Sequence, residues 1–195
     1  MTPTVTGLRE RKRGGVAIEL DGEAWRVLPA DAVVRAGLAV GRRLDRHAAR
    51  KLAREVRRAK ALAAATKSLA VRDHSQQALE HRLMRAGHSA DAREEALAAL
   101  DRAGLLDDTR VAQGRAELLA RRGYGDAAIR ADLRRRLIPA EAAADAVAGL
   151  EAELDRSRRL LEGKSVTPAL LRRLAGRGFS RETLDEIASA FAHEP

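Results

Sequence analysis

The 195-residue chain contains no cysteine and very few aromatic side chains, which make up 2% of its residues. Without cysteine the chain can form neither a disulfide framework nor a thiolate metal site, and this absence fits a reducing compartment. No apolar run approaches the roughly 18 residues of a membrane-spanning helix, and the basic N-terminus leads into no signal-like apolar core. We therefore expect a cytoplasmic protein without a membrane partner.

Apolar residues make up 45% of the chain, but a large share of them is alanine. Alanine favours helix and buries little area, so helical units built from it have thin cores. Units of roughly 45 residues with such cores cannot usually stand alone, and they must pack against neighbours.

Four apolar positions keep their spacing in three copies along the chain. The second copy is shifted by 50 (119 − 69) and the third by a further 41 (160 − 119). The copies are Leu69, Leu79, Leu83 and Leu100; Leu119, Ile129, Leu133 and Leu150; and Leu160, Leu170, Leu174 and Phe191. A helical repeat produces this pattern because each copy buries the same face. We predict a mainly α fold of tandem three-helix modules in an elongated, monomeric array.

In the first 40 residues the apolar side chains follow a different spacing. Residues 16–20 and 23–28 alternate as strands do, and Asp21-Gly22 between them predicts a two-residue hairpin turn. Residues 4–9 are expected to add a third strand.

Pro29 ends strand pairing and suits the first turn of a short helix. Trp25 is the only tryptophan. We expect it to anchor the core of the small sheet, with a stacking platform as the less favoured alternative.

From Asp45 onward the pattern is helical. An apolar stripe of one long helix consists of Ala48, Leu52, Val56, Ala59 and Ala63. Further helices are predicted to begin after Ser75, Ser89, Asp107 and Thr167-Pro168, which can accept hydrogen bonds from the unpaired N–H groups of a first turn. The expected parts are a β-hairpin segment with a short helix (1–44), a basic helix with module 1 (45–104), module 2 (105–150) and module 3 (151–195).

Residues that could form an active site are few, and simpler roles explain them. Gly14-Gly15 lacks the Lys-Ser/Thr of a phosphate-binding loop, and Asp107-Asp108 lies where a helix begins, so capping explains it better than metal binding. His74, His81 and His88 are seven residues apart, too distant for neighbouring ligands on one straight helix. We expect no enzyme, no metal and no cofactor.

The net charge is +9, which makes a polyanionic partner plausible. Some arginines share a stripe of the long helix, and others recur between modules 1 and 2 under the 50-residue shift. The candidate basic surface comprises Arg50, Arg54, Arg57, Arg58, Arg72, Arg85, Arg122 and Arg135. The competing interpretation is a merely solvated polar face.

Leucines, glycines and a few polar residues form one longer pattern: Leu69, Arg72, Ser75, Leu79, Leu83, Gly87, Leu100, Gly104, Leu106, Asp108 and Ala112, then Arg121, Gly123-Tyr124-Gly125, Ile129 and Leu133. In these residues the chain resembles the bacterial RecX family of RecA regulators. The sequence departs from the family pattern at Ala78, Val111 and His74, where an acidic, an aromatic and an arginine residue are common.

The resemblance implies a non-enzymatic protein that lies in the groove of RecA–single-stranded DNA filaments and inhibits recombinase, ATPase and co-protease activity. Single- and double-stranded DNA are further candidate partners. The alternative is a helical nucleic-acid-binding protein that acts on DNA directly.

Overall fold

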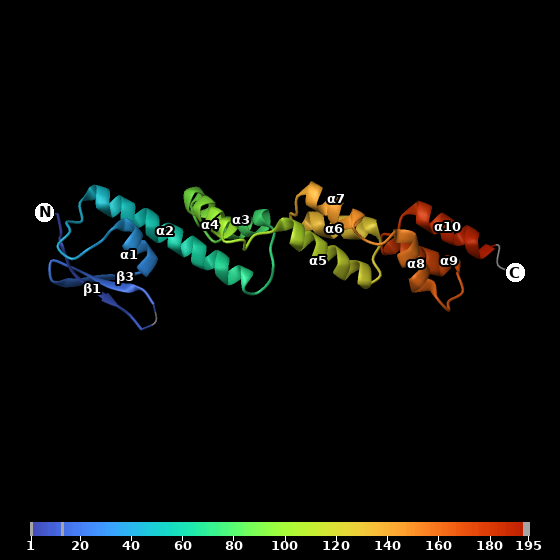
Figure 1. Ribbon diagram of the computed structural model, residues 1–195, viewed down its shortest axis with the longest axis horizontal. Helices are drawn as coiled ribbons and strands as arrows, with labels where there is room; N and C mark the ends of the chain where they lie inside the picture. The colour runs from blue at the N-terminus through green and yellow to red at the C-terminus, as the bar shows by residue number, and fades with distance from the viewer. Residues whose placement is uncertain (1, 13, 193–195) are drawn as a thin grey trace. The chain divides into compact units, whose positions relative to one another are not determined.

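The computed structural model describes residues 2–12 and 14–192, with side chains up to residue 190. The described residues form a small sheet followed by helices, which confirms the predicted mainly helical fold (Figure 1). The elements are β1 (Val5–Glu10), β2 (Val16–Leu20), β3 (Glu23–Leu28), α1 (Ala30–Ala36), α2 (Arg46–Leu69), α3 (Gln76–Arg85), α4 (Ala90–Arg102), α5 (Asp108–Arg121), α6 (Asp126–Arg135), α7 (Ala140–Ala148), α8 (Glu153–Leu161), α9 (Pro168–Gly176) and α10 (Arg181–Ala192).

The chain divides into two compact units. The first contains Met1–Arg72 and Leu79–Leu105, and the second contains Asp73–Ala78 and Leu106–Pro195. The first turn of α3 therefore belongs to the second unit. The predicted module borders after residues 44, 104 and 150 all fall in connections between helices and stay a proposal.

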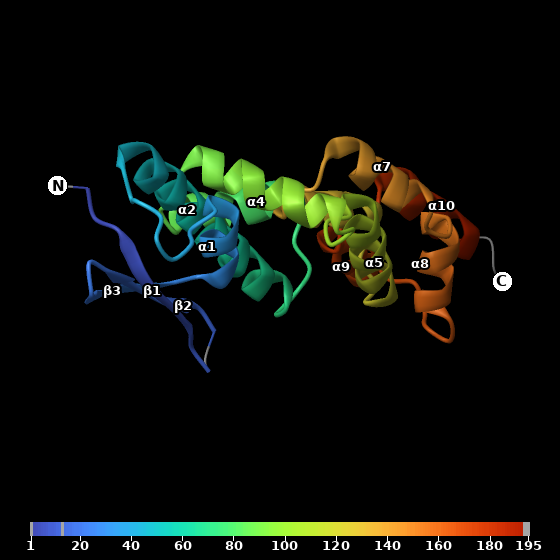
Figure 2. The ribbon, with the colours of Figure 1, turned by 60° about the vertical axis from the view of Figure 1, so that its left-hand side comes forward.

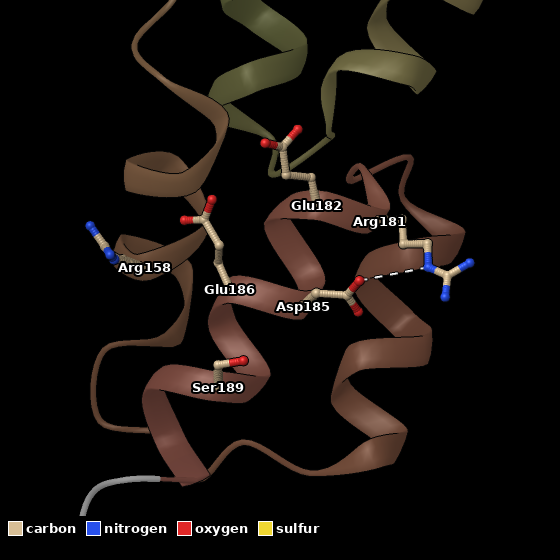
Figure 3. A pocket seen from close by; sticks show the side chains of 6 residues that line it. All are labelled: Arg158, Arg181, Glu182, Asp185, Glu186 and Ser189. Carbon is tan, nitrogen blue, oxygen red and sulfur yellow. Dashed lines mark ion pairs between the residues drawn. The ribbon is translucent and has the colours of Figure 1, made fainter.

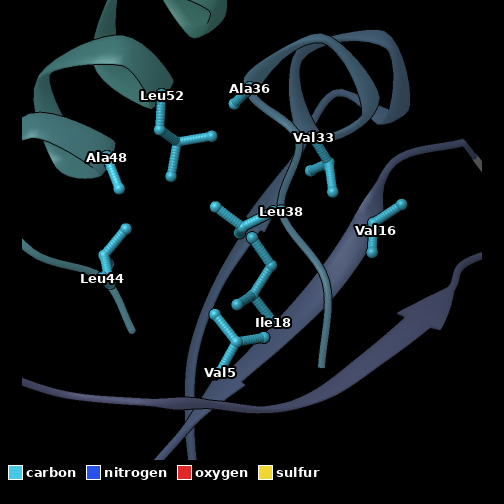
Figure 4. Packing of buried hydrophobic residues seen from close by; sticks show 9 residues of the cluster. All are labelled: Val5, Val16, Ile18, Val33, Ala36, Leu38, Leu44, Ala48 and Leu52. Atoms are coloured by element: carbon cyan, nitrogen blue, oxygen red, sulfur yellow. The ribbon is translucent and has the colours of Figure 1, made fainter. Parts of the chain in front are cut away.

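The sheet of the first unit is antiparallel with the order β1-β2-β3. Asp21 and Gly22 both have positive φ, 50° and 87°, as a two-residue type I′ turn requires, so the predicted hairpin is confirmed. The third strand is also confirmed as β1. The α1 and α2 helices follow the sheet in the chain and lie beside it (Figure 2). Their side chains meet those of β1 and β2 in one core, in which Ile18 is 1% exposed (Figure 4).

The prediction that Trp25 anchors this core is wrong. Trp25 is 38% exposed, and β3 is an edge strand whose residues are mostly exposed. The pairing shifts here: Ile18 opposes Arg26 and Glu19 opposes Ala24, so Trp25 is the extra residue of a β-bulge. The guanidinium carbon of Arg26 lies 5.4 Å from the centroid of the Trp25 ring.

The buried face of α2 changes along its length. In the first half Ala48 and Leu52 pack against the sheet, as predicted. In the second half Ala61 and Ala65 are fully buried, and Ala61 packs with Ala92 and Ala96 of α4. Ala63 is exposed, so its place in the predicted stripe is wrong: contact with α4 turns a different face of the helix inward.

The second unit contains α5–α7 and α8–α10, each group with its own apolar cluster. Ile129 and Leu133 are fully buried in the first cluster, and Leu174 is 4% exposed in the second. In the first unit the equivalent Leu79 and Leu83 are 0% and 1% exposed. Most positions of the repeated apolar frame are thus buried. Leu69, Leu150, Leu160 and Leu170 are half-buried. The side chain of Phe191 lies outside the described residues.

Two connections within the second unit are built alike. Ser75, just before α3, donates its hydroxyl to the carbonyl of Arg136 just after α6, at 2.8 Å. Gly125, just before α6, donates its N–H to the carbonyl of Arg177 just after α9, at 2.9 Å. The residues correspond under the same shifts, 50 (125 − 75) and 41 (177 − 136). Equivalent positions of the repeat therefore share this hydrogen-bonded contact as well as their buried residues.

The predicted helix caps differ in outcome. Ser75, Asp107 and Thr167 accept hydrogen bonds from backbone N–H groups three residues further on. Ser89 precedes α4 as predicted, but its side chain makes no capping hydrogen bond.

Candidate basic interaction surface

The long helix α2 presents a strongly basic outer side because its only acidic residue is turned inward. Asp45 caps the helix by accepting the N–H of Ala48 at 2.8 Å. Glu55 is 3% exposed. Its carboxylate receives Arg35 of α1 at 3.1 Å and Arg54 at 3.4 Å. No carboxylate of α2 is therefore available to neutralise cations on the exposed side.

Exposed cations follow one side of α2 at intervals of 4, 7, 3 and 7 residues, which keep to one helix face. Within the part of the chain that the structure describes, none of them has an ion-pair partner. We call this set the α2 cationic face: Arg46, Arg50, Arg57, Lys60 and Lys67.

Only part of this face was predictable from the sequence. Arg50 and Arg57 were predicted and are exposed; Arg54 is also exposed but pairs with Glu55. Arg46, Lys60 and Lys67 were not predicted, although the same spacing, continued to both sides of Arg50 and Arg57, could have revealed them.

Arg58 does not lie on the exposed surface that the sequence predicted. Its side chain is 10% exposed, and it donates to Asp31 of α1 at 2.9 Å. Its Nε also lies 3.7 Å from Glu95 of α4. Arg58 therefore links three helices of the first unit, and we remove it from the candidate surface.

The other predicted arginines are exposed at helix ends. In the first unit Arg72 follows α2 and Arg85 ends α3; in the second Arg122 follows α5 and Arg135 ends α6. Arg135 pairs with Asp132 at 3.4 Å.

Asp132 gathers several cations of the second unit on one carboxylate. Arg115 donates to it twice, at 2.7 and 3.1 Å, and Arg136 donates at 2.8 Å. Hydrogen bonds from Arg115 and then Arg136 lower the pKa of Asp132 to about 2 against the opposing effect of burial. Charge near α6 is thus partly compensated, unlike the charge on α2.

An open hollow of about 650 Å³ lies on α10 (Figure 3). Arg158 of α8 lines it with Arg181, Glu182, Asp185, Glu186 and Ser189 of α10. Asp185 is paired with Arg181 at 3.6 Å. No histidine is among these lining residues. Across the described residues no group of three or more histidine, aspartate or glutamate side chains could hold a metal ion.

Among the described helices, none is both long enough and apolar enough to cross a membrane.

These features define a mainly helical protein of three-helix groups with a small leading sheet and an exposed cationic helix. Its fold is that of RecX structures, as the resemblance implied. The crystal structure of regulatory protein RecX matches with a TM-score of 0.79 at 19% identity, over 96% of this chain and 99% of that one. The crystal structure of RecX from Lactobacillus salivarius matches with a TM-score of 0.63 at 18% identity, over 70% and 97%. At these identities the likeness establishes the fold.

Neither a protein-family model nor a curated protein matches the sequence.

Proposed function

We propose that this protein is a RecX-type regulator that binds RecA–single-stranded DNA filaments and inhibits RecA recombinase, ATPase and co-protease activity. The observation that carries the proposal is the fold match to regulatory protein RecX over nearly the full length of both chains. The sequence resemblance through Ser75, Gly87 and Gly104 supports it independently. This role needs access to DNA, and we place the protein, as a monomer, in the cytoplasm.

The exposed arginines suit such a partner. A nucleoprotein filament presents phosphate and acidic side chains along its length, and arginine pairs with both. We propose that Arg72, Arg85, Arg122 and Arg135 contact the filament from equivalent places in the two units. No catalytic group is required for this action.

The direct test is the DNA-dependent ATPase of RecA measured while the protein is added. We expect inhibition at amounts well below those of RecA, since a filament regulator acts on many RecA subunits at once. Unchanged ATP hydrolysis at equal amounts of the two proteins would refute the proposal.

The contribution of the recurring arginines is tested by replacing Arg85, Arg122 and Arg135 with Glu. Inhibition should be lost in a graded way as charges are reversed, because ionic contacts add up. The melting temperature should change little, since exposed ion pairs contribute little stability. Full inhibition by the folded triple variant would place the filament contact elsewhere.

A second candidate function is direct binding to DNA, and the α2 cationic face is the observation that favours it.

A further inference from the structure

The two helix groups of the second unit, α5–α7 and α8–α10, have separate cores and meet mainly through turns. Their buried apolar residues form two clusters that share no member, and the helix pairs of this unit that pack closely lie within one group. Where the groups meet, the N–H groups of Gly125 and Ala127 at the start of α6 donate to carbonyls of the turn between α9 and α10, at 2.9 and 3.1 Å. We call this region the α6–α8 joint: residues 124–127, Glu153, Arg156 and residues 177–180.

Glu153, the first residue of α8, uses its two carboxylate oxygens in different directions. Its Oε1 accepts the N–H of Asp126, the first residue of α6, at 2.6 Å. Its Oε2 accepts the N–H of Ser180 at 3.0 Å and the hydroxyl of Thr183 at 2.9 Å, at the start of α10. Burial raises the pKa of Glu153, but the hydrogen bonds from Ser180, Asp126 and Thr183 outweigh this effect and lower the pKa. The ionised carboxylate therefore serves each group with one oxygen.

Arg156, one turn further along α8, makes a second connection to the start of α6. Its side chain is 8% exposed. It donates to the carboxylate of Asp126 and, at 3.2 Å, to the carbonyl of Tyr124, while its Nε donates to the carbonyl of Glu151 at 2.9 Å. A buried guanidinium without acceptors is costly, so these contacts favour one position of α8 relative to α6.

The contact between α3 and α5 repeats the hydrogen bond but not the ion pair. Asp108, the first residue of α5, accepts the N–H of Gln76, the first residue of α3, at 2.8 Å. Three residues after Asp108, at the place of Arg156 in α8, Val111 packs with the apolar cluster of α5–α7. Gln76 and Val111 carry no charge, so the α6–α8 joint is the more ionic of the two contacts.

We propose that the α6–α8 joint is a hinge whose angle is fixed by Glu153 and Arg156. Hydrogen bonds between charged groups are strong and directional, whereas the described apolar clusters do not cross the joint. Loss of either charged contact frees α8–α10 to turn relative to α5–α7 while both cores remain folded. The hinge thereby sets where the exposed cations of α9, Arg172 and Arg173, lie relative to α5–α7.

The first test compares Glu153→Gln with the parent, both as the full-length protein. Glutamine keeps the size of the side chain but has a single acceptor oxygen, so it cannot serve both groups. Amide hydrogen exchange followed by NMR should show protection factors of Gly125 and Ala127 reduced by at least about tenfold, since loss of a charged hydrogen bond favours opening of the joint. Protection of Leu133 and Leu174, inside the two cores, should stay as in the parent.

A distance measurement reports the angle itself. Because the chain has no cysteine, Ala144→Cys on α7 and Arg172→Cys on α9 place one spin label at an exposed position of each group. The distance distribution from electron paramagnetic resonance should be narrow in the parent and broader with Glu153→Gln. Asp126→Ala should broaden it as well, because Arg156 then loses its charged partner on the other side of the joint.

Glu162→Gln is the matched control, because Glu162 is exposed and directly follows α8; exchange and distances should stay as in the parent. Unchanged protection and distances in both Glu153→Gln and Asp126→Ala would overturn the inference, as would equal effects of the control. Loss of protection throughout α8–α10 in both variants would also overturn it, because these residues would then stabilise one group rather than the angle between two. RecA takes no part in either measurement, so the hinge is tested separately from the proposed function.

Discussion

Asp132 illustrates how a single carboxylate organises the charge of this arginine-rich protein. It accepts hydrogen bonds from Arg115 of α5 and from Arg136, which follows its own helix α6. Its side chain is only 15% exposed. A partly buried carboxylate held by two guanidinium groups stabilises the fold while it is ionised.

The pH dependence of this stabilisation follows from the direction of the shift. The pKa of Asp132 is about 2 in the folded protein and near 3.9 when unfolded. The stabilisation is therefore complete above about pH 4 and is lost as the pH falls towards 2. Asp132→Asn should lower the free energy of unfolding at pH 7 by about 1–2 kcal/mol, allowing for solvent screening.

Urea denaturation of parent and variant between pH 7 and pH 2 measures this difference, which should shrink across the acid range. Asp145→Asn, at an exposed position of α7, is the matched control and should have little effect. A difference that stays constant with pH would mean that the carboxylate charge is not what stabilises the contact.

Trp25 shows what residue type alone cannot reveal. Its size made it the natural core anchor, yet the core beneath the sheet is filled by Ile18 and by side chains from α1 and α2. The β-bulge at Trp25 depends on how β3 pairs with β2, and periodicity within one strand does not contain that information. Arg58 is similar, because its partner Asp31 is 27 residues away in the chain.

Among the helices, the repeated apolar frame makes a direct prediction for α3 and α6. Leu83 and Leu133 are 1% and 0% exposed. Replacing either with Ala should cost about 2–4 kcal/mol through lost contacts and cavity formation. Met84→Ala is the control, since Met84 neighbours Leu83 but is 51% exposed. If the leucine variants unfold at the same urea concentration as the Met84 variant, these residues do not carry the cores.

The connection between α6 and α9 makes a second prediction from a close backbone approach. A Cβ at Gly125 would lie 2.3 Å from the backbone of Gly178, so Gly125→Ala forces the two segments apart. We expect a loss of about 1–3 kcal/mol. Gly114, within α5, meets nothing within 4 Å, and Gly114→Ala should stabilise the protein by about 0.5–1 kcal/mol.

Replacement by alanine is thus expected to lower the stability of the protein at Gly125 and to raise it at Gly114. Thermal unfolding followed by circular dichroism measures the stability of both variants. A stabilising Gly125→Ala would show that the segments can separate at no cost.

Most element positions were predictable because their signals are local. The Asp21-Gly22 turn, the Thr167-Pro168 helix start and the spacing of the buried leucines each depend on a few neighbouring residues. The wrong prediction for Ala63 has another cause: Ala63 is exposed because α4 packs against Ala61 and Leu62 instead. Contacts between elements decide which face of a long alanine-rich helix is buried, and a single helical period does not predict them.

For the molecule as a whole, the sequence predicts the net charge but not which cations are free of ion-pair partners. The net charge of +9 is shared among arginines with very different surroundings. Arg115 and Arg136 are engaged by Asp132, whereas Arg50 and Arg57 have no ion-pair partner within the described residues. Helical spacing identified the stripe on α2, but only the fold shows that Glu55 faces inward.

The two candidate functions predict different affinities for single-stranded DNA that is covered by RecA. A protein that binds DNA directly needs exposed phosphates, so RecA on single-stranded DNA should compete with it. A filament regulator gains contacts from RecA itself. We expect binding to RecA-coated single-stranded DNA to be at least about tenfold tighter than to the bare strand, or about 1.4 kcal/mol.

Anisotropy of a labelled oligonucleotide measures bare-strand binding, and co-sedimentation with filaments held by a slowly hydrolysed ATP analogue measures the coated strand. Raising the salt concentration should weaken bare-strand binding steeply, because that binding depends on counterion release alone. Binding to filaments should weaken less, since part of its free energy comes from contacts with protein. Tighter binding to the bare strand, with the steeper salt dependence retained on filaments, would favour a direct DNA-binding protein over a RecA regulator.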